Sequence, residues 1–156
     1  MTNLIVNGDF ETGTLTGWTN TGGTTGGSGT ESSTVTTGSK HSGTYGCAQS
    51  ATINSKYDTA FARIVQTIAS NLEKIEFWYK CAHVVAGANT TNYLWVTASG
   101  FASDESPTDI DVLSLRDVTA GTWVFVSITR AEILGEWYHF GATTTITITS
   151  GIGGIY

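Results

Sequence analysis

The sequence predicts an all-β protein, and three observations support that prediction. Charged residues make up only 13% of the 156 residues while glycine occurs 19 times, a composition typical of short strands joined by many turns. Period-two alternation of apolar and polar residues recurs along the chain. Turn residues separate these stretches, so about eight to ten short strands are expected. We therefore expect a single domain over residues 1–156, built as a β-sandwich of two antiparallel sheets.

The stretch KIEFWYKC at 74–81 is the clearest strand. Successive side chains of a strand point to opposite faces of the sheet. One face is apolar and predicted to meet the core; it carries Ile75, Phe77, Tyr79 and Cys81. The other carries Lys74, Glu76, Trp78 and Lys80. Trp78 is thus an indole among charges, on a face that either binds something or is partly covered by a loop.

The remaining elements are predicted from the same patterns. A short strand at 4–6 opens into the turn NGDFE, and residues 19–29, which are only Gly, Thr, Ser and Asn, predict a surface loop. Further strands are expected at 34–36, 41–48, 61–69, 93–99, 112–115, 123–129, 137–142 and 143–150. In the strand at 93–99 the alternation places Leu94, Val96 and Ala98 inward, with Tyr93 and Trp95 outward.

Composition argues against several function classes. A net charge of −6 with only 7 Lys and Arg disfavours nucleic acid or an anionic membrane as a partner. No apolar run approaches the ~20 residues of a membrane span. No signal peptide is visible near Met1, so we expect a module of a larger protein or a protein released by another route, such as within a virus particle.

Catalytic and zinc-binding patterns are not found either. A glycosidase needs two facing carboxylates, but Glu73 and Glu76 have opposite parities, and no nucleophile-elbow motif occurs. The two cysteines, Cys47 and Cys81, form no CxxC motif, so a zinc site is not expected. We expect a protein that is not an enzyme.

Several motifs together resemble a known family. In order they are LIVNGDFETGTLTGW, HSGTYG, IVQTI, IEFWYK and WYHFGATTT. This pattern resembles the jelly-roll, galactose-binding-domain-like carbohydrate-binding modules attached to xylanases and β-glucanases, and the resemblance covers nearly the whole chain. It implies a jelly roll, a fold that hosts many functions. Related modules also occur in phage tail and capsid proteins and in bacterial surface proteins, which implies an extracellular or virion-surface location.

The resemblance also implies a binding face. Jelly-roll topology places the strands at 41–48, 137–142, 74–81 and 93–99 side by side in that order, so their outward aromatic residues form one plate. Sugar rings need flat aromatic platforms beside donors and acceptors. The predicted carbohydrate site is therefore Trp78, Trp95, Trp137 and Tyr93, with His139, Glu76 and Lys80 as polar partners. The alternatives are protein–protein assembly through the same face, by self-association or within a larger parent protein, and packing under a loop.

Two further expectations follow from the resemblance. Family members bind a structural calcium through the Glu of NGDFE and an Asp in a final strand; here Glu11 is present, but the chain ends at Tyr156 with that strand short or truncated. Calcium at Glu11 is therefore expected with one carboxylate fewer. In the implied strand order, Cys47 and Cys81 lie two strands or ~9.5 Å apart, beyond the ~7 Å limit of a disulfide, which predicts two buried free thiols.

Overall fold

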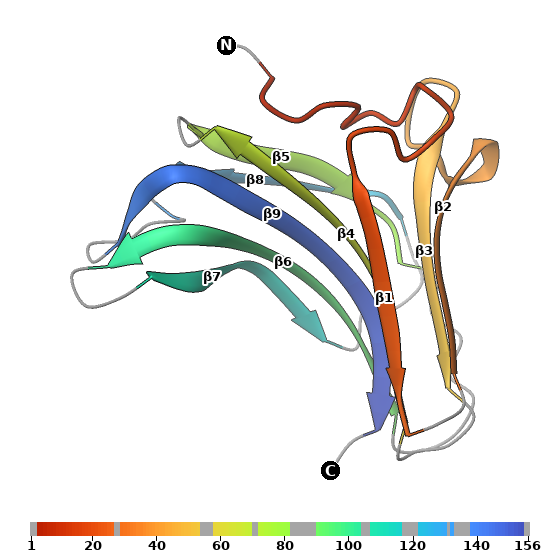
Figure 1. Ribbon diagram of the computed structural model, residues 1–156. Coiled ribbons are helices and arrows are strands. Elements are labelled where there is room, and N and C mark those ends of the chain that lie inside the picture. The colour runs from red at the N-terminus through yellow and green to blue at the C-terminus, as the bar shows by residue number, and fades with distance from the viewer. Residues whose placement is uncertain are drawn as a thin grey trace.

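The protein is a β-sandwich whose layers differ in size (Figure 1). The computed structural model describes residues 3–26, 29–53, 58–69, 72–81, 90–103, 107–116, 122–130, 132 and 138–154. In parts of 90–103, 107–116 and 138–154 it describes the backbone alone. In these ranges no helix has the length and apolar character needed to cross a membrane.

The larger layer is a five-stranded antiparallel sheet in the order β1-β4-β9-β6-β7. Its strands are β1 (Thr19–Thr25), β4 (Thr59–Ala69), β9 (Tyr138–Gly154), β6 (Thr90–Ser103) and β7 (Pro107–Arg116). The longer strands bend along a common arc (Figure 1). The pairing of β6 with β9 shifts register between Ser99 and Phe101, a bulge that interrupts the ladder locally.

The second layer consists of two separate strand pairs. One pairs β2 (Gly29–Thr36) with β3 (Gly46–Ile53), joined through the 3-10 turn η1 (Thr37–Ser39), and the other pairs β5 (Lys74–Tyr79) with β8 (Val124–Thr129). Both pairs lie on the outer side of the arc (Figure 1), where β3 contacts β4 and β9. No described strand lies on the inner side of the arc, which we call the free face of the five-stranded sheet.

The core lies between the two layers. Its buried residues come mostly from the five-stranded sheet and are Ile68, Leu72, Val96, Ala98 and Ile146. From the second layer Ile75, Phe77 and Ile128 pack against them. The predicted parities are thus confirmed: β5 turns its odd residues to the core and its even residues to solvent, while Leu94, Val96 and Ala98 of β6 are buried.

The predicted strand order is wrong. The strand that carries Trp78 pairs with β8, and the strand that carries Tyr93 and Trp95 pairs with β9 and β7 in the other layer. β3 pairs with β2 and not with the strand at 137–142. The reason is that 138–154 forms one continuous strand, which lies between β4 and β6 along most of its length.

Two local expectations near the N-terminus also fail. The predicted loop at 19–29 is largely strand, because β1 pairs with β4 in full register from Thr19↔Val65 to Thr25↔Thr59. Threonine favours strands, and this edge strand needs no large side chains. The predicted strand at 4–6 is irregular, and hydrogen bonds to the Gln66 side chain hold it in place. Gln66 Oε1 accepts from Val6 N (2.7 Å), and Gln66 Nε2 donates to Val6 O (3.0 Å) and Gly17 O (2.9 Å).

Both cysteines are free thiols, as predicted, but each is half-buried rather than buried. They lie in or beside different strand pairs, Cys47 in β3 and Cys81 after β5. Burial raises the pKa of the Cys47 thiol to about 11, so this thiol stays protonated at neutral pH.

Candidate functional site

The predicted aromatic plate is divided between two opposite surfaces. Trp78 is on the side of β5 that points away from the core, and Tyr93 and Trp95 are on the side of β6 that points away from the same core. Because the core lies between these two strands, the two sets of rings face in opposite directions. They cannot form one site.

The first surface is the free side of the five-stranded sheet, which we call the arginine–aromatic face. Antiparallel partners in direct register share a side of the sheet, so the pairing defines its rows. One row runs Phe61, Gly151, Tyr93; the next runs Arg63, Thr149, Trp95, Ser114. Glycine lacks a side chain, so no side chain separates Phe61 from Tyr93 in the first row.

Contacts within this face tie its members together. Tyr93 and Trp95 lie with ring centroids 4.6 Å apart at 32°. The guanidinium carbon of Arg63 is 4.8 Å from the centroid of the Phe61 ring, and Arg63 Nε donates to Thr149 Oγ1 at 3.1 Å. Burial raises the pKa of Tyr93, and the nearby charge of Arg63 partly opposes that rise. The face is therefore an aromatic pair beside a positioned cation.

Threonine hydroxyls extend this face along β9. Thr145 and Thr147 continue along β9 on this side of the sheet, with Thr67 Oγ1 2.9 Å from Thr145 Oγ1 across the β4–β9 pair. The indole Nε1 of Trp95 is buried and finds no hydrogen-bond acceptor among the described residues. An unpaired buried donor is costly by about 1–3 kcal/mol, and this N–H lies beneath the surface of the face.

The second surface is the outer side of β5 and β8. Trp78 and Phe125 lie opposite each other in the register, 5.0 Å apart, and are 46% and 48% exposed. His41 stacks on Trp78 at 4.0 Å and 10°, and meets Trp123 edge-on at 5.2 Å. We call these four residues the β5–β8 patch. The imidazole covers one face of the Trp78 indole, so Trp78 is partly covered by the HSG loop yet remains exposed.

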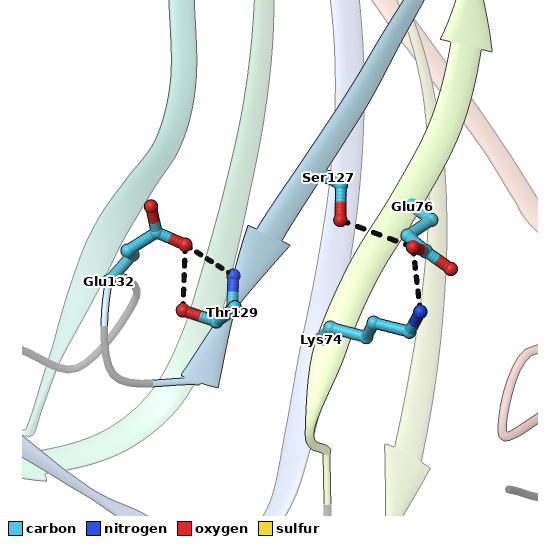
Figure 2. A network of polar contacts seen from close by, with 5 residues as sticks. All are labelled: Lys74, Glu76, Ser127, Thr129 and Glu132. Carbon is cyan, nitrogen blue, oxygen red and sulfur yellow. Dashed lines mark hydrogen bonds and ion pairs between the residues drawn. The ribbon is translucent and has the colours of Figure 1, made fainter.

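Polar groups adjoin this patch on the same side of the strand pair (Figure 2). Glu76 Oε1 accepts hydrogen bonds from Lys74 Nζ (2.7 Å) and Ser127 Oγ (3.1 Å). The bond from Lys74 is the largest cause and lowers the pKa of Glu76; desolvation opposes it, and the bond from Ser127 and the charge of Lys74 lower the pKa further. At the end of β8, Glu132 Oε2 accepts bonds from Thr129 N (2.7 Å) and Oγ1 (2.6 Å). These carboxylates already have partners within the protein.

The other predicted site residues are placed as follows. Lys80 is exposed just after β5, at the same parity as Trp78. His139 lies in β9 opposite Ala102 of β6. Trp137 falls outside the described residues. The structure thus groups Glu76 and Lys80 with Trp78, and groups Trp95 with Tyr93.

Glu11 of the NGDFE turn holds the HSG loop. Its Oε1 accepts hydrogen bonds from Thr44 N (2.8 Å) and Tyr45 N (3.0 Å), which lower the pKa of its carboxyl. Gly43 has φ 71° and passes so close that a Cβ there would collide with the carboxylate. Among the described residues no three His, Cys, Asp or Glu side chains gather to hold a metal ion. Beside Glu11, Asp9 Oδ1 accepts a hydrogen bond from the Glu11 backbone N–H at 3.3 Å, so a second carboxylate of the NGDFE turn lies in this part of the chain.

Sequence reasoning missed Phe61, Arg63 and Thr149 on the first surface and His41 and Phe125 on the second. The alternation of FARIVQTIA separates Arg63 from Ile64 and Ile68, but Arg63 meets Thr149, 86 residues away, only through the β4–β9 pairing, and Trp95 joins the same row through the β6–β9 pairing. No local pattern encodes those pairings.

Comparisons with solved structures agree on the fold. No protein-family model and no curated protein matches this chain. A structure of carbohydrate-binding modules from the β-sandwich superfamily matches over 92% of this chain and 57% of that chain, with a TM-score of 0.57 and 14% identity. The enzymatically active domain of bacteriophage CBA120 tailspike protein 4 matches over 96% of this chain and 20% of that chain, with a TM-score of 0.54 and 17% identity.

A third structure, TmCBM61 in complex with β-1,4-galactotriose, matches over 97% of this chain and 93% of that chain, with a TM-score of 0.48 and 16% identity. The chain has the jelly-roll β-sandwich fold of the structures that it matches with a TM-score above 0.5. It spans about a fifth of the tailspike domain and about three-fifths of the superfamily module structure that it matches.

Proposed function

We propose that this chain is a non-catalytic carbohydrate-binding module that binds a poly- or oligosaccharide on the arginine–aromatic face. The observation that carries the proposal is the Tyr93–Trp95 ring pair at 4.6 Å on the free, inward-curving side of the five-stranded sheet. Pyranose rings have apolar C–H faces that stack on aromatic rings and hydroxyl edges that need hydrogen-bond partners. Threonine hydroxyls that continue the face along β9 offer such partners.

The fold supports this assignment only as a scaffold, because one fold serves many functions. The side chains of the face therefore carry the assignment. Among the described residues, both strand pairs of the second layer lie on the other side of the sheet and leave this face uncovered. A sheet face that curves around a ligand contacts more of an extended chain than a flat one does.

The test is glycan binding by Trp95→Ala. Trp95 points away from the core, so its removal should leave the fold intact while affinity for the bound glycan falls by about 2 kcal/mol or more, roughly thirtyfold. A glycan array identifies the ligand and calorimetry measures the affinity. Trp78→Ala, on the opposite surface, is the matched control and should bind as the wild type does. If Trp95→Ala bound the glycan as tightly as the wild type does, that result would contradict the proposal.

A second candidate function uses the other surface. Trp78 and Phe125 are among the few exposed large hydrophobic residues of the described chain, and they lie side by side. Exposed aromatic clusters mark protein contacts more often than chance. We propose the β5–β8 patch for assembly, with another copy or with a parent protein at a cell or virion surface. Light scattering of wild type and Trp78→Ser tests self-assembly: a concentration-dependent oligomer that the substitution dissolves supports it, and a monomer in both contradicts it.

A further inference from the structure

The arginine–aromatic face carries a cation whose position is unusual for this protein. The chain has only 7 Lys and Arg and a net charge of −6. Arg63 nevertheless lies in the row that also contains Trp95 and is half-buried between strands of the free sheet face. Because cations are rare in this acidic protein, we look for the reason for this arginine in its immediate surroundings.

Two contacts hold Arg63, and neither uses the terminal nitrogens of its guanidinium group. Its Nε donates to Thr149 Oγ1 at 3.1 Å, and its guanidinium lies 4.8 Å from the centroid of the Phe61 ring. Thr149 is itself buried, at 4% exposure, so it anchors the guanidinium rather than moving with it. Within the described part of the chain, the two terminal nitrogens of Arg63 donate to no acceptor.

A purely structural arginine would be expected to pair with a carboxylate. The ion pairs of the described residues are elsewhere: Lys74–Glu76 on β5 and Arg130–Glu73 at the end of β8. Arg63 joins neither. A guanidinium fixed through Nε and a ring face presents its two terminal N–H groups as a preformed fork, which matches the two oxygens of a carboxylate.

We propose that the arginine–aromatic face selects acidic glycans, with the carboxylate of a uronic acid unit paired to Arg63 while a neighbouring sugar ring stacks on Tyr93 and Trp95. This inference rests on the proposed function and adds the substrate class. The distances fit one sugar chain: Arg63 and Trp95 flank Thr149 in one row, so they are separated by two strand spacings, or about 9.5 Å. One oligosaccharide chain can span that backbone spacing and so contact both Arg63 and the ring pair.

Long-range attraction does not explain such binding. An acidic protein repels an acidic polymer at a distance, so affinity must come from the local pairing. Nonspecific adsorption of polyanions is therefore not expected, and loss of one cation on the opposite surface should change nothing.

The experiment uses a panel of uronic acid polysaccharides: polygalacturonate, alginate, hyaluronan and glucuronoxylan. Each is tested beside its carboxyl-reduced form, in which the same backbone is neutral. Binding is measured by affinity electrophoresis and calorimetry for wild type, Arg63→Gln, Arg63→Lys and Trp95→Ala. Lys74→Gln, which removes a cation from the β5–β8 side, is the charge-matched control. Thermal melts establish that each variant is folded.

We expect wild type to bind at least one acidic polymer about tenfold or more tightly than its reduced form. Arg63→Gln should reduce affinity for the acidic form to that for the neutral form, Arg63→Lys should restore only part of it because lysine lacks the fork, and Lys74→Gln should have no effect. Trp95→Ala should weaken both forms. If Arg63→Gln destabilises the protein, the acidic-to-neutral ratio measured on wild type still decides the question.

Three results would overturn the inference. Equal affinity for charged and neutral forms, or acidic binding that survives Arg63→Gln, contradicts acidic selectivity while leaving the proposed function standing. Binding that Lys74→Gln weakens as much as Arg63→Gln does would place the acidic contact elsewhere or show it to be diffuse. Absence of binding to every polymer, charged or neutral, contradicts both the inference and the proposed function.

Discussion

Glu11 joins two turns that are distant in the sequence. One of its carboxylate oxygens receives the backbone N–H groups of Thr44 and Tyr45, and this is the main reason its pKa lies below 4.5. A carboxylate whose folded-state pKa is depressed stabilises the fold fully above its unfolded pKa and loses that effect as the pH falls. The HSG loop that carries His41 therefore depends on the charge state of Glu11.

We predict that Glu11→Gln lowers stability at neutral pH and flattens its acid dependence. The glutamine oxygen can accept the same bonds but has no charge, so the contribution that wild type loses below about pH 4.5 is already absent. Urea unfolding at pH 7 and pH 3 measures it. The difference between wild type and variant should be larger at pH 7. An equal difference at both values would mean that the carboxylate charge contributes nothing.

The calcium site at Glu11 remains a prediction taken from the family resemblance. Calcium takes six to eight oxygen ligands, and among the described residues no three His, Cys, Asp or Glu side chains gather around Glu11. If an ion binds there, added calcium raises the melting temperature by linkage and EDTA lowers it. Glu11→Gln should abolish both shifts. A melting temperature that neither reagent changes would contradict the site.

At the scale of single elements, adjacent residues of β5 point to opposite sides of the strand, one to the core and the next to solvent. Phe77 packs against the buried core, whereas Trp78 points outward and touches His41 and Phe125. We predict that Phe77→Ala costs about 3 kcal/mol, the low end for phenylalanine because the ring is only partly buried. Trp78→Ala should cost about 1 kcal/mol, the value of its ring contacts.

Chemical denaturation of this pair of variants measures the parity directly. A larger loss for Trp78→Ala than for Phe77→Ala would place β5 in the wrong register by one residue.

Gln66 is a polar residue that holds the N-terminal segment before β1 in place. It is buried in β4, and its amide satisfies three backbone groups of the N-terminal segment. We predict that Gln66→Ala costs about 3 kcal/mol, at roughly 1 kcal/mol for each bond lost. Thr67→Ala, next to it on the free face, should cost less than about 1 kcal/mol. Urea unfolding of both variants tests this, and equal losses would show that the bonds to the N-terminal segment are not stabilising.

Sequence alone predicted much of this at the level of strands. Alternation gave the correct inward and outward residues in β5 and β6, because period two is a local property of a half-buried strand. It did not predict β1, whose Gly and Thr residues look like loop until an edge of the sheet is available. Strand order failed for a related reason: which strands pair depends on contacts across the whole chain, as with Arg63 and Thr149.

At the scale of the whole molecule, the sandwich separates two surfaces that the sequence suggested were one. The free side of the five-stranded sheet carries Tyr93, Trp95 and Arg63, and the outer side of the smaller layer carries Trp78 and Phe125. Glycan binding and assembly would then use different residues and should be separable by mutation. This separation matters for any module held in a larger assembly, because one surface can be occupied while the other stays free.

The most direct test of this account is calorimetric titration of one glycan ligand, identified by array, into wild type, Trp95→Ala and Trp78→Ala at equal concentration. The account predicts that Trp95→Ala weakens binding by roughly thirtyfold or more and that Trp78→Ala retains wild-type affinity, with both variants folded. The reverse pattern, in which Trp78→Ala loses the glycan and Trp95→Ala keeps it, would contradict the assignment of the binding site to the five-stranded sheet.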